Sequence, residues 1–257
     1  MNLRRQQAFI NGEWCDAHSG NTFAVHNPAN GEAIAQVADL GTAETRQAVD
    51  AAARALVTWR AATAHERSAI LKRWFKLITL HQRELAQLLS LEQGKPLSEA
   101  LGEISYGASF IEWFAEEGKR IYGETIPSPS AQRRLVTVKQ PVGVVAAITP
   151  WNFPCAMITR KVGPALAAGC TVVLKPAAET PLTALALAVL AEEAGLPPGV
   201  LNVITSSDAA AVGATLTASH IVRKLSFTGS TRIGKLLMAQ SADTVKNCPL
   251  NWAATRR

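Results

Sequence analysis

The chain of 257 residues is 48% hydrophobic and 18% charged, a balance typical of a folded globular protein and not of a disordered one. Its formal net charge is +6, but basic residues are interleaved with acidic ones, as in EEGKRIYGE, which disfavours a nucleic-acid partner. No stretch approaches the roughly 20 uninterrupted apolar residues of a membrane helix, and the start lacks the apolar run of a signal peptide. We therefore expect a cytoplasmic protein that binds neither nucleic acid nor membrane.

The cysteines predict neither a metal site nor a disulfide. Cys15, Cys155, Cys170 and Cys248 lie far apart in the sequence and form no Cys-x-x-Cys pair. Zinc and redox motifs depend on such close pairs, and disulfides are uncommon in proteins that are not secreted. No bound metal is expected.

The first half is predicted to be mainly helical. In the first forty residues, short apolar runs separated by Asn-Pro and Asn-Gly pairs predict strands and turns. Apolar residues at spacings of three and four then predict helices, which cover residues 42–62, 63–95 (interrupted near His81) and 98–123. Gly94, with Pro96 just beyond it, is a typical helix end.

In the second half, short apolar strands alternate with helices. Two strands split at Gln140-Pro141 are followed by helix 154–168, strand 171–175, helix 182–194, strand 200–205, helix 208–216, strand 223–227 and helix 230–241. Apolar strands that alternate with helices form a parallel sheet covered on both faces. The expected fold class is α/β with a doubly wound parallel sheet, whose ligand site lies off the carboxyl ends of the strands.

Three strand ends carry candidate site residues. Asn152 lies between Pro150 and Pro154, which stiffen the turn, so its amide either stabilises a developing oxyanion or caps the next helix; the spacing alone favours the cap. Lys175 ends the next strand. Its ammonium group there either binds a ribose or phosphate or is exposed to solvent. Gly229 permits a tight turn before a helix whose free N–H groups attract phosphate. No Gly-x-Gly-x-x-Gly motif is present, so these residues predict only a nucleotide-binding α/β protein.

A resemblance to the aldehyde dehydrogenase superfamily is carried by four segments: PWNFPCAMITRKVGPALAAGCTVVLKPAAETP, KLSFTGST, LEQGKPLSEALGEI and FIEWFAEEGKRIYGETIP. They are most similar to the bacterial branch that oxidises succinate semialdehyde in 4-aminobutyrate degradation. The resemblance covers residues 5 to about 246, roughly the first half of a family member. It implies that residues 1–257 are a truncated, Rossmann-like cofactor-binding domain without the catalytic domain.

The resemblance also implies roles for individual residues. Asn152 corresponds to the oxyanion-hole amide, and Lys175 to a lysine that binds the adenosine ribose. Gly229 and Ser230 correspond to the turn that binds the pyrophosphate. The implied cofactor contacts are Thr149, Pro150, Trp151, Asn152, Lys175, Pro176, Ala177, Ala178, Phe227, Gly229 and Ser230.

Arg160, with Phe153, is the implied substrate-binding residue, because a guanidinium group suits the distal carboxylate of succinate semialdehyde. The alternative is an arginine on a helix surface. Glutarate semialdehyde or another acidic aldehyde is the alternative substrate.

Two departures from the family pattern bear on the cofactor. Ala178 stands where many NAD-preferring members have a glutamate that repels a 2′-phosphate, so we expect NADP to be accepted, with NAD as the alternative cofactor. Ser206 stands at a family glycine, with Asp208 close behind, and we expect their bulk and charge to weaken the approach of a phosphate.

In the family, a cysteine thiolate attacks the aldehyde, and a glutamate activates the water that hydrolyses the resulting thioester. That cysteine lies in a Gly-Gln-x-Cys segment, which this sequence lacks, and Cys155 and Cys170 lie in segments predicted to pack between strand and helix. We therefore expect this chain alone to be inactive. The alternatives are a module that binds NADP without turnover and a remnant that does not fold.

The remaining segments concern assembly and the end of the chain. Residues 123–141 correspond to a hairpin that reaches a partner subunit in homo-oligomeric relatives, and we expect this fragment to be unable to assemble. Relatives continue as KKLSLELGGNAP, which includes the catalytic glutamate, where this chain has KNCPLNWAATRR over 246–257. Deleting one base from plausible codons for the family stretch reproduces all of these residues. We therefore expect 247–257 to be a frameshift product, with Cys248 an accident of reading frame.

Overall fold

The computed structural model describes residues 2–252 as an α/β fold built on a seven-stranded sheet. The strand order is β11 (Leu250–Trp252), β10 (Val222–Gly229), β7 (Val144–Ile148), β8 (Thr171–Lys175), β9 (Leu201–Val203), β1 (Ala8–Ile10) and β2 (Glu13–Cys15). Strands β11 to β9 run parallel, whereas β1 and β2 join antiparallel. The predicted doubly wound parallel sheet is confirmed.

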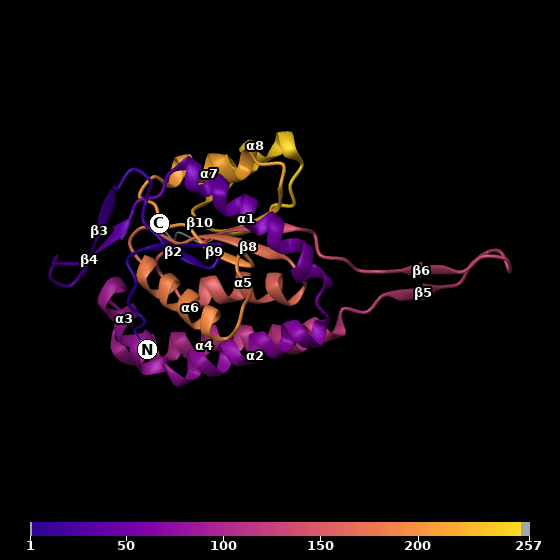
Figure 1. The fold of residues 1–257 in the computed structure, drawn as a ribbon, viewed down its shortest axis with the longest axis horizontal. Coiled ribbons are helices and arrows are strands. Elements are labelled where there is room, and N and C mark those ends of the chain that lie inside the picture. The colour runs from indigo at the N-terminus through magenta and orange to yellow at the C-terminus, as the bar shows by residue number, and fades with distance from the viewer. Residues whose placement is uncertain (1, 253–257) are drawn as a thin grey trace.

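Helices cover both faces of this sheet (Figure 1). On one face lie α1 (Thr42–Ala61), α7 (Ala209–Ala218) and α8 (Thr231–Ser241). On the other lie α5 (Ala156–Ala167) and α6 (Pro181–Glu193), backed by α2 (Ala64–Leu80), α3 (Gln82–Gln93) and α4 (Leu97–Glu117). Short 3₁₀ turns follow α4 and α8, at Gly118–Arg120 and Ala242–Thr244.

The strand β7 shows why its sequence has no polar alternation. Val145 and Ala147 pack into the core between the sheet and α5, while Val144 and Ala146 pack into the core beneath α1 and α7. Both faces of the strand are therefore buried, which requires an unbroken apolar run.

The predicted helix break and helix end are both present. The long run 63–95 divides at His81 into α2 and α3. Gly94 then ends α3 with φ +85°, and a Cβ at this position would lie 2.7 Å from Pro28. Glycine is needed here both for the left-handed backbone and for the close contact.

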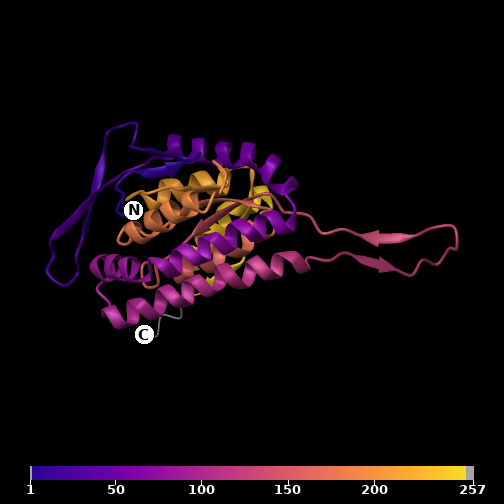
Figure 2. The ribbon, with the colours of Figure 1, turned by 60° about the horizontal axis from the view of Figure 1, so that its bottom comes forward.

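Two antiparallel hairpins lie outside the main sheet. Strands β3 (Thr22–His26) and β4 (Ala33–Ala38) form one, and β5 (Glu124–Ile126) and β6 (Leu135–Thr137) form the other. The β5–β6 hairpin extends far from the body of the molecule in both views (Figures 1 and 2).

The tail adds an edge strand that the sequence did not indicate. In β11, Leu250 is the parallel partner of Phe227 and Trp252 of Gly229. Residues 253–257 of the expected frameshift product lie outside the described residues.

Candidate active site

A cavity of about 520 Å³ lies at the carboxyl edge of the sheet. The register places Ile148, Lys175 and Phe227 side by side at the ends of β7, β8 and β10. Of the expected cofactor contacts, those that line the cavity are Thr149, Pro150, Trp151, Lys175, Ala177, Ala178, Phe227, Gly229 and Ser230. Asn152 and Pro176 do not line it; Asn152 lies in the turn beyond Trp151, and Pro176 is buried.

The opposite wall of the cavity was missed by sequence reasoning. It is formed by residues of α7 and α8, among them Gly213, Ile233, Leu236, Leu237 and Gln240. These positions look like ordinary core residues of a helix in the sequence. The sequence offers one signal for these residues. Both helices follow strands of a parallel sheet, and the ligand sites of such sheets lie beyond the carboxyl ends of those strands.

Lys175 is buried at the base of this cavity. The residue is 4% exposed, and burial lowers the pKa of its ammonium group, while Glu179, Asp39 and Asp208 act in the opposite direction. A buried ammonium group close to a cavity is well placed to bind a hydroxyl or phosphate oxygen, since most of its desolvation cost is already met by the fold.

Two hydroxyl groups fit a polar ligand in the same place. Oγ1 of Thr149 and Oγ1 of Thr228 are buried without a hydrogen-bond partner among the described residues. Both residues line the cavity. Buried polar groups are normally paired, so these orphaned atoms, together with Lys175, suit a large polar ligand such as NAD(P).

The role of Gly229 differs from the expected tight turn. Its φ lies outside the left-handed region, but a Cβ at this position would lie 2.4 Å from Cζ of the Phe227 ring. Glycine is therefore needed for space, because it lets this aromatic ring fold back against the end of β10. The next residue, Ser230, caps α8 by accepting the Ile233 N–H at 3.4 Å, which leaves the start of the helix beside the cavity.

The two residues expected to weaken the approach of a phosphate, Ser206 and Asp208, are held by contacts outside the cavity. Ser206 is 1% exposed, and its hydroxyl turns toward Asp39, 3.4 Å away. The Asp208 carboxylate caps α7 by accepting the Ala211 N–H at 2.9 Å. Neither residue lines the cavity; Ser207, whose hydroxyl donates to Asp39 at 2.6 Å, lies there instead.

Of the two alternatives for Asn152, the structure does not support the helix cap. Helix α5 begins after Cys155, and the N–H groups of Cys155 and Ala156 donate to the Glu103 carboxylate at 2.9 and 3.2 Å. The carboxamide oxygen of Asn152 is buried without a hydrogen-bond partner among the described residues. The side chain is therefore free of the helix end and open to a role in binding.

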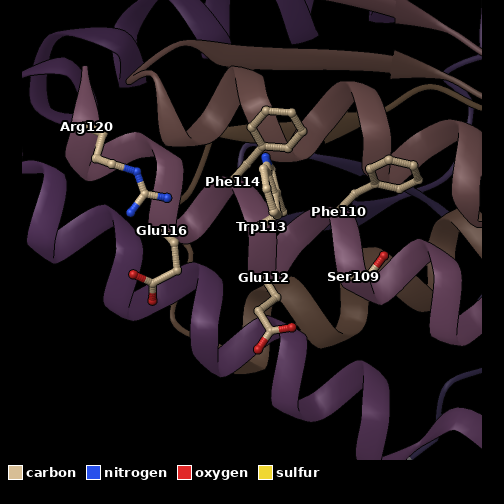
Figure 3. A pocket seen from close by; sticks show the side chains of 7 residues that line it. All are labelled: Ser109, Phe110, Glu112, Trp113, Phe114, Glu116 and Arg120. Atoms are coloured by element: carbon tan, nitrogen blue, oxygen red, sulfur yellow. The ribbon is translucent and has the colours of Figure 1, made fainter. Parts of the chain in front are cut away.

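Arg160 and Phe153 lie on the exposed side of the α4–α5 pair. Phe153 is 43% exposed, and the Arg160 guanidinium lies 5.3 Å from the centre of the Phe110 ring. Phe110 also borders a second cavity, of about 610 Å³, on the outer face of α4. Figure 3 shows the aromatic and charged side chains that line it.

That second cavity is a weaker candidate despite its size. The Glu116 carboxylate is paired with Lys72 and Lys119, and Arg120 is paired with Glu117. Glu116 and Arg120 therefore already have partners within the chain, and Asn152 does not line this cavity.

Lys161 was not predicted as a buried residue. Its ammonium group donates to the Ser226 hydroxyl at 3.0 Å, and burial, together with the charge of Arg160, lowers its pKa to about 8. A lysine in a helix normally reaches solvent, so nothing in the sequence distinguishes this one.

Cys15, Cys155 and Cys170 are poor nucleophiles where they lie. Cys155 and Cys170 are buried, and burial, reinforced by Glu103, raises the pKa of the Cys155 thiol well above its usual range. Burial also raises the pKa of Cys15. A thiol becomes nucleophilic only as a thiolate.

Among the described residues, no group of three or more metal-ligating side chains is present, and no helix has the length and apolarity to cross a membrane.

Residues 14–255 match the profile of the Aldehyde dehydrogenase family. The chain belongs to this family. It is 65% identical to the NADP(+) succinate-semialdehyde dehydrogenase of Escherichia coli, over 97% of this chain and 52% of that protein. It is 63% identical to the glutarate-semialdehyde dehydrogenase of Pseudomonas putida, over 96% of this chain and 52% of that protein.

The fold agrees with that of a related protein of known structure. A crystal structure described as an E. coli NADP-dependent enzyme superposes with a TM-score of 0.96 at 64% identity, over 97% of this chain and 52% of that one. This chain therefore spans about half the length of the relatives that it matches.

Proposed function

We propose that this chain forms the cofactor-binding and oxyanion-stabilising part of an NAD(P)+-dependent dehydrogenase that oxidises an aldehyde with a distal carboxylate, such as succinate semialdehyde. The observation that carries the proposal is the cavity at the carboxyl edge of the sheet, with buried Lys175 at its base and the Asn152 turn at its rim. The names of the E. coli and P. putida relatives support an acidic aldehyde as the substrate.

The cavity residues define how the cofactor would be held. When bound, NAD(P)+ supplies the hydride acceptor. Lys175 donates to the ribose or its phosphate, and the N-terminus of α8 beside Ser230 offers N–H groups to the pyrophosphate. Ala178 brings no negative charge to the cavity wall, which supports NADP, and the E. coli relative carries NADP in its name. The carboxylate of Glu179 lies on the same wall, which favours NAD as the alternative.

Two residues outside the cavity would act on the aldehyde. The Asn152 amide donates to the carbonyl oxygen as negative charge develops on it, which is the usual contribution of a side-chain amide to acyl chemistry. Arg160, exposed on α5, binds the distal carboxylate through its planar guanidinium group.

The attacking thiolate is not provided by Cys155 or Cys170. Both are buried, and at Cys155 burial favours the uncharged thiol. We propose that a polypeptide of these 257 residues alone binds cofactor without oxidising aldehydes. An aldehyde-dependent rise in NADPH absorbance with that polypeptide would contradict this.

The β5–β6 hairpin is the proposed contact to a second subunit. Its apolar side chains are turned to solvent, with Val136 65% and Val138 74% exposed. Exposed apolar side chains and free strand edges favour association. In an enzyme that contains the complete chain, deleting residues 124–137 should convert an oligomer to monomers in size-exclusion chromatography; an unchanged elution volume would refute the contact.

The substrate class is tested by Arg160→Ala in a full-length enzyme that carries residues 1–246 of this sequence and continues with the second half of a relative. Loss of one partner of a charge-assisted pair costs about 2–5 kcal/mol, so kcat/KM for succinate semialdehyde should fall at least about 30-fold. Butanal, which has no distal carboxylate, should be little affected. Equal losses for both aldehydes would remove Arg160 from the substrate site.

A further inference from the structure

The turn that carries Asn152 and Phe153 is held by a lysine–glutamate pair from a distant part of the chain. Lys95 lies between α3 and α4, and Glu103 lies in the second turn of α4. The Lys95 ammonium group is 2.5 Å from Oε2 of Glu103, and the two side chains are 10% and 1% exposed. The pair is therefore largely withdrawn from water.

Each partner also contacts the Asn152 turn. The Lys95 ammonium group donates to the backbone carbonyl oxygen of Asn152 at 3.2 Å and lies 4.1 Å from the centre of the Phe153 ring. The other Glu103 oxygen, Oε1, accepts the N–H groups of Cys155 and Ala156. One ion pair therefore fixes both ends of the segment 152–156.

The Asn152 side chain depends on this backbone support. Its carboxamide oxygen has no hydrogen-bond partner among the described residues, so nothing bonded to that oxygen sets the direction of the amide. The direction is then set by the backbone from which the side chain extends. A group that must meet a reacting oxygen tolerates only small displacements.

We propose that Lys95 and Glu103 are positioning residues that hold the Asn152 carboxamide in its working direction. The proposal rests on the role of Asn152 in the proposed function. A buried ion pair brings little net stability by comparison with an apolar pair, so fold stability alone is a weak reason for placing these charges here. Their contacts converge instead on the backbone of the residue that would receive the oxyanion.

The direct test is nuclear magnetic resonance of the Asn152 side-chain amide in the full chain. Its two N–H signals are identified by their loss in Asn152→Asp. In Lys95→Met and in Glu103→Gln these signals should shift and broaden. In Lys95→Arg, which keeps the charge and the donors, they should stay as in the unmodified chain. Lys72→Met is the matched control, because Lys72 also pairs with a glutamate but lies exposed on α2.

The same samples are titrated with NADP to separate this proposal from the proposed function. Cofactor affinity in Lys95→Met should stay within about threefold of the unmodified chain, since Lys95 does not line the cofactor cavity. Unchanged Asn152 signals in Lys95→Met and in the isosteric Glu103→Gln would overturn the positioning role. Absence of NADP binding to the unmodified chain would instead count against the cofactor site. The amide signals would still test the positioning role of Lys95 and Glu103.

Discussion

Raising the pH should destabilise the fold through a single buried carboxyl group, that of Glu92. This residue lies near the end of α3, is 2% exposed, and accepts the N–H groups of Leu182 at 2.7 Å and Thr183 at 2.8 Å at the start of α6. Burial raises the pKa of Glu92 from 4.5 to about 7, although the two N–H groups favour the carboxylate.

The pKa of Glu92 fixes both the sign and the size of the effect. Between pH 4.5 and about 7 the folded state holds a proton that the unfolded chain releases, so the unfolding free energy falls as the pH rises. The stabilisation is fully present below pH 4.5 and is lost above about pH 7. At roughly 1.4 kcal/mol for each pH unit, the total change is about 3 kcal/mol.

Urea unfolding of the unmodified chain and of Glu92→Gln, at several values between about pH 5 and about pH 8, measures this effect. The glutamine cannot ionise, so the stability difference between the two proteins should shift by most of that 3 kcal/mol toward the variant as the pH rises. Glu193→Gln, at an exposed position at the end of α6, controls for exchanging a carboxylate for an amide. A difference that stays constant across the pH range would refute the reasoning.

Two further substitutions and one sequencing experiment test the site and the tail. Lys175→Met should raise the Kd for NADP between about 10-fold and about 150-fold, since a hydrogen bond to a charged group contributes about 1.5–3 kcal/mol; calorimetry showing less than a twofold change would remove Lys175 from the cofactor site. Gly229→Ala should lower the unfolding free energy by about 1–3 kcal/mol, because its Cβ would lie 2.4 Å from the Phe227 ring, and thermal unfolding that matches the unmodified chain would contradict this. For residues 247–257 we propose a frameshift, and sequencing of the locus tests it. A gene that stays in frame here, and in which no other reading frame downstream encodes a Gly-Gln-x-Cys segment, would contradict it.

The sheet could be predicted because its signals are local. The run TVVLK is strand β8 with the expected bounds, since five apolar or extended-favouring residues follow one helix and precede another. Lys175, Gly229 and Ser230 were found for the same reason, because strand ends of a parallel sheet meet at one edge.

The contacts that hold the backbone of the site could not be predicted, because they join residues that are far apart in the sequence. Glu103 caps α5 across 52 residues, so the sequence around Asn152 could not show that the helix start is capped from elsewhere. Glu92 caps α6 across 90 residues, and Lys95 meets Asn152 across 57. Charged residues normally face solvent, both in amphipathic helices and in the link that carries Lys95, and only the folded arrangement shows that these do not. Strand β11 was missed because its residues have no strand pattern of their own and pair only with β10.

The central claim is that this chain holds NAD(P) in the cavity at the carboxyl edge of the sheet. The most direct measurement is a titration of the purified chain with NADP followed by tryptophan fluorescence, since Trp151 is 53% exposed and lines that cavity. We predict a saturable change in fluorescence that is lost in Trp151→Phe, while calorimetry still detects binding by that variant. No change in fluorescence and no heat of binding at about 1 mM NADP would contradict the claim.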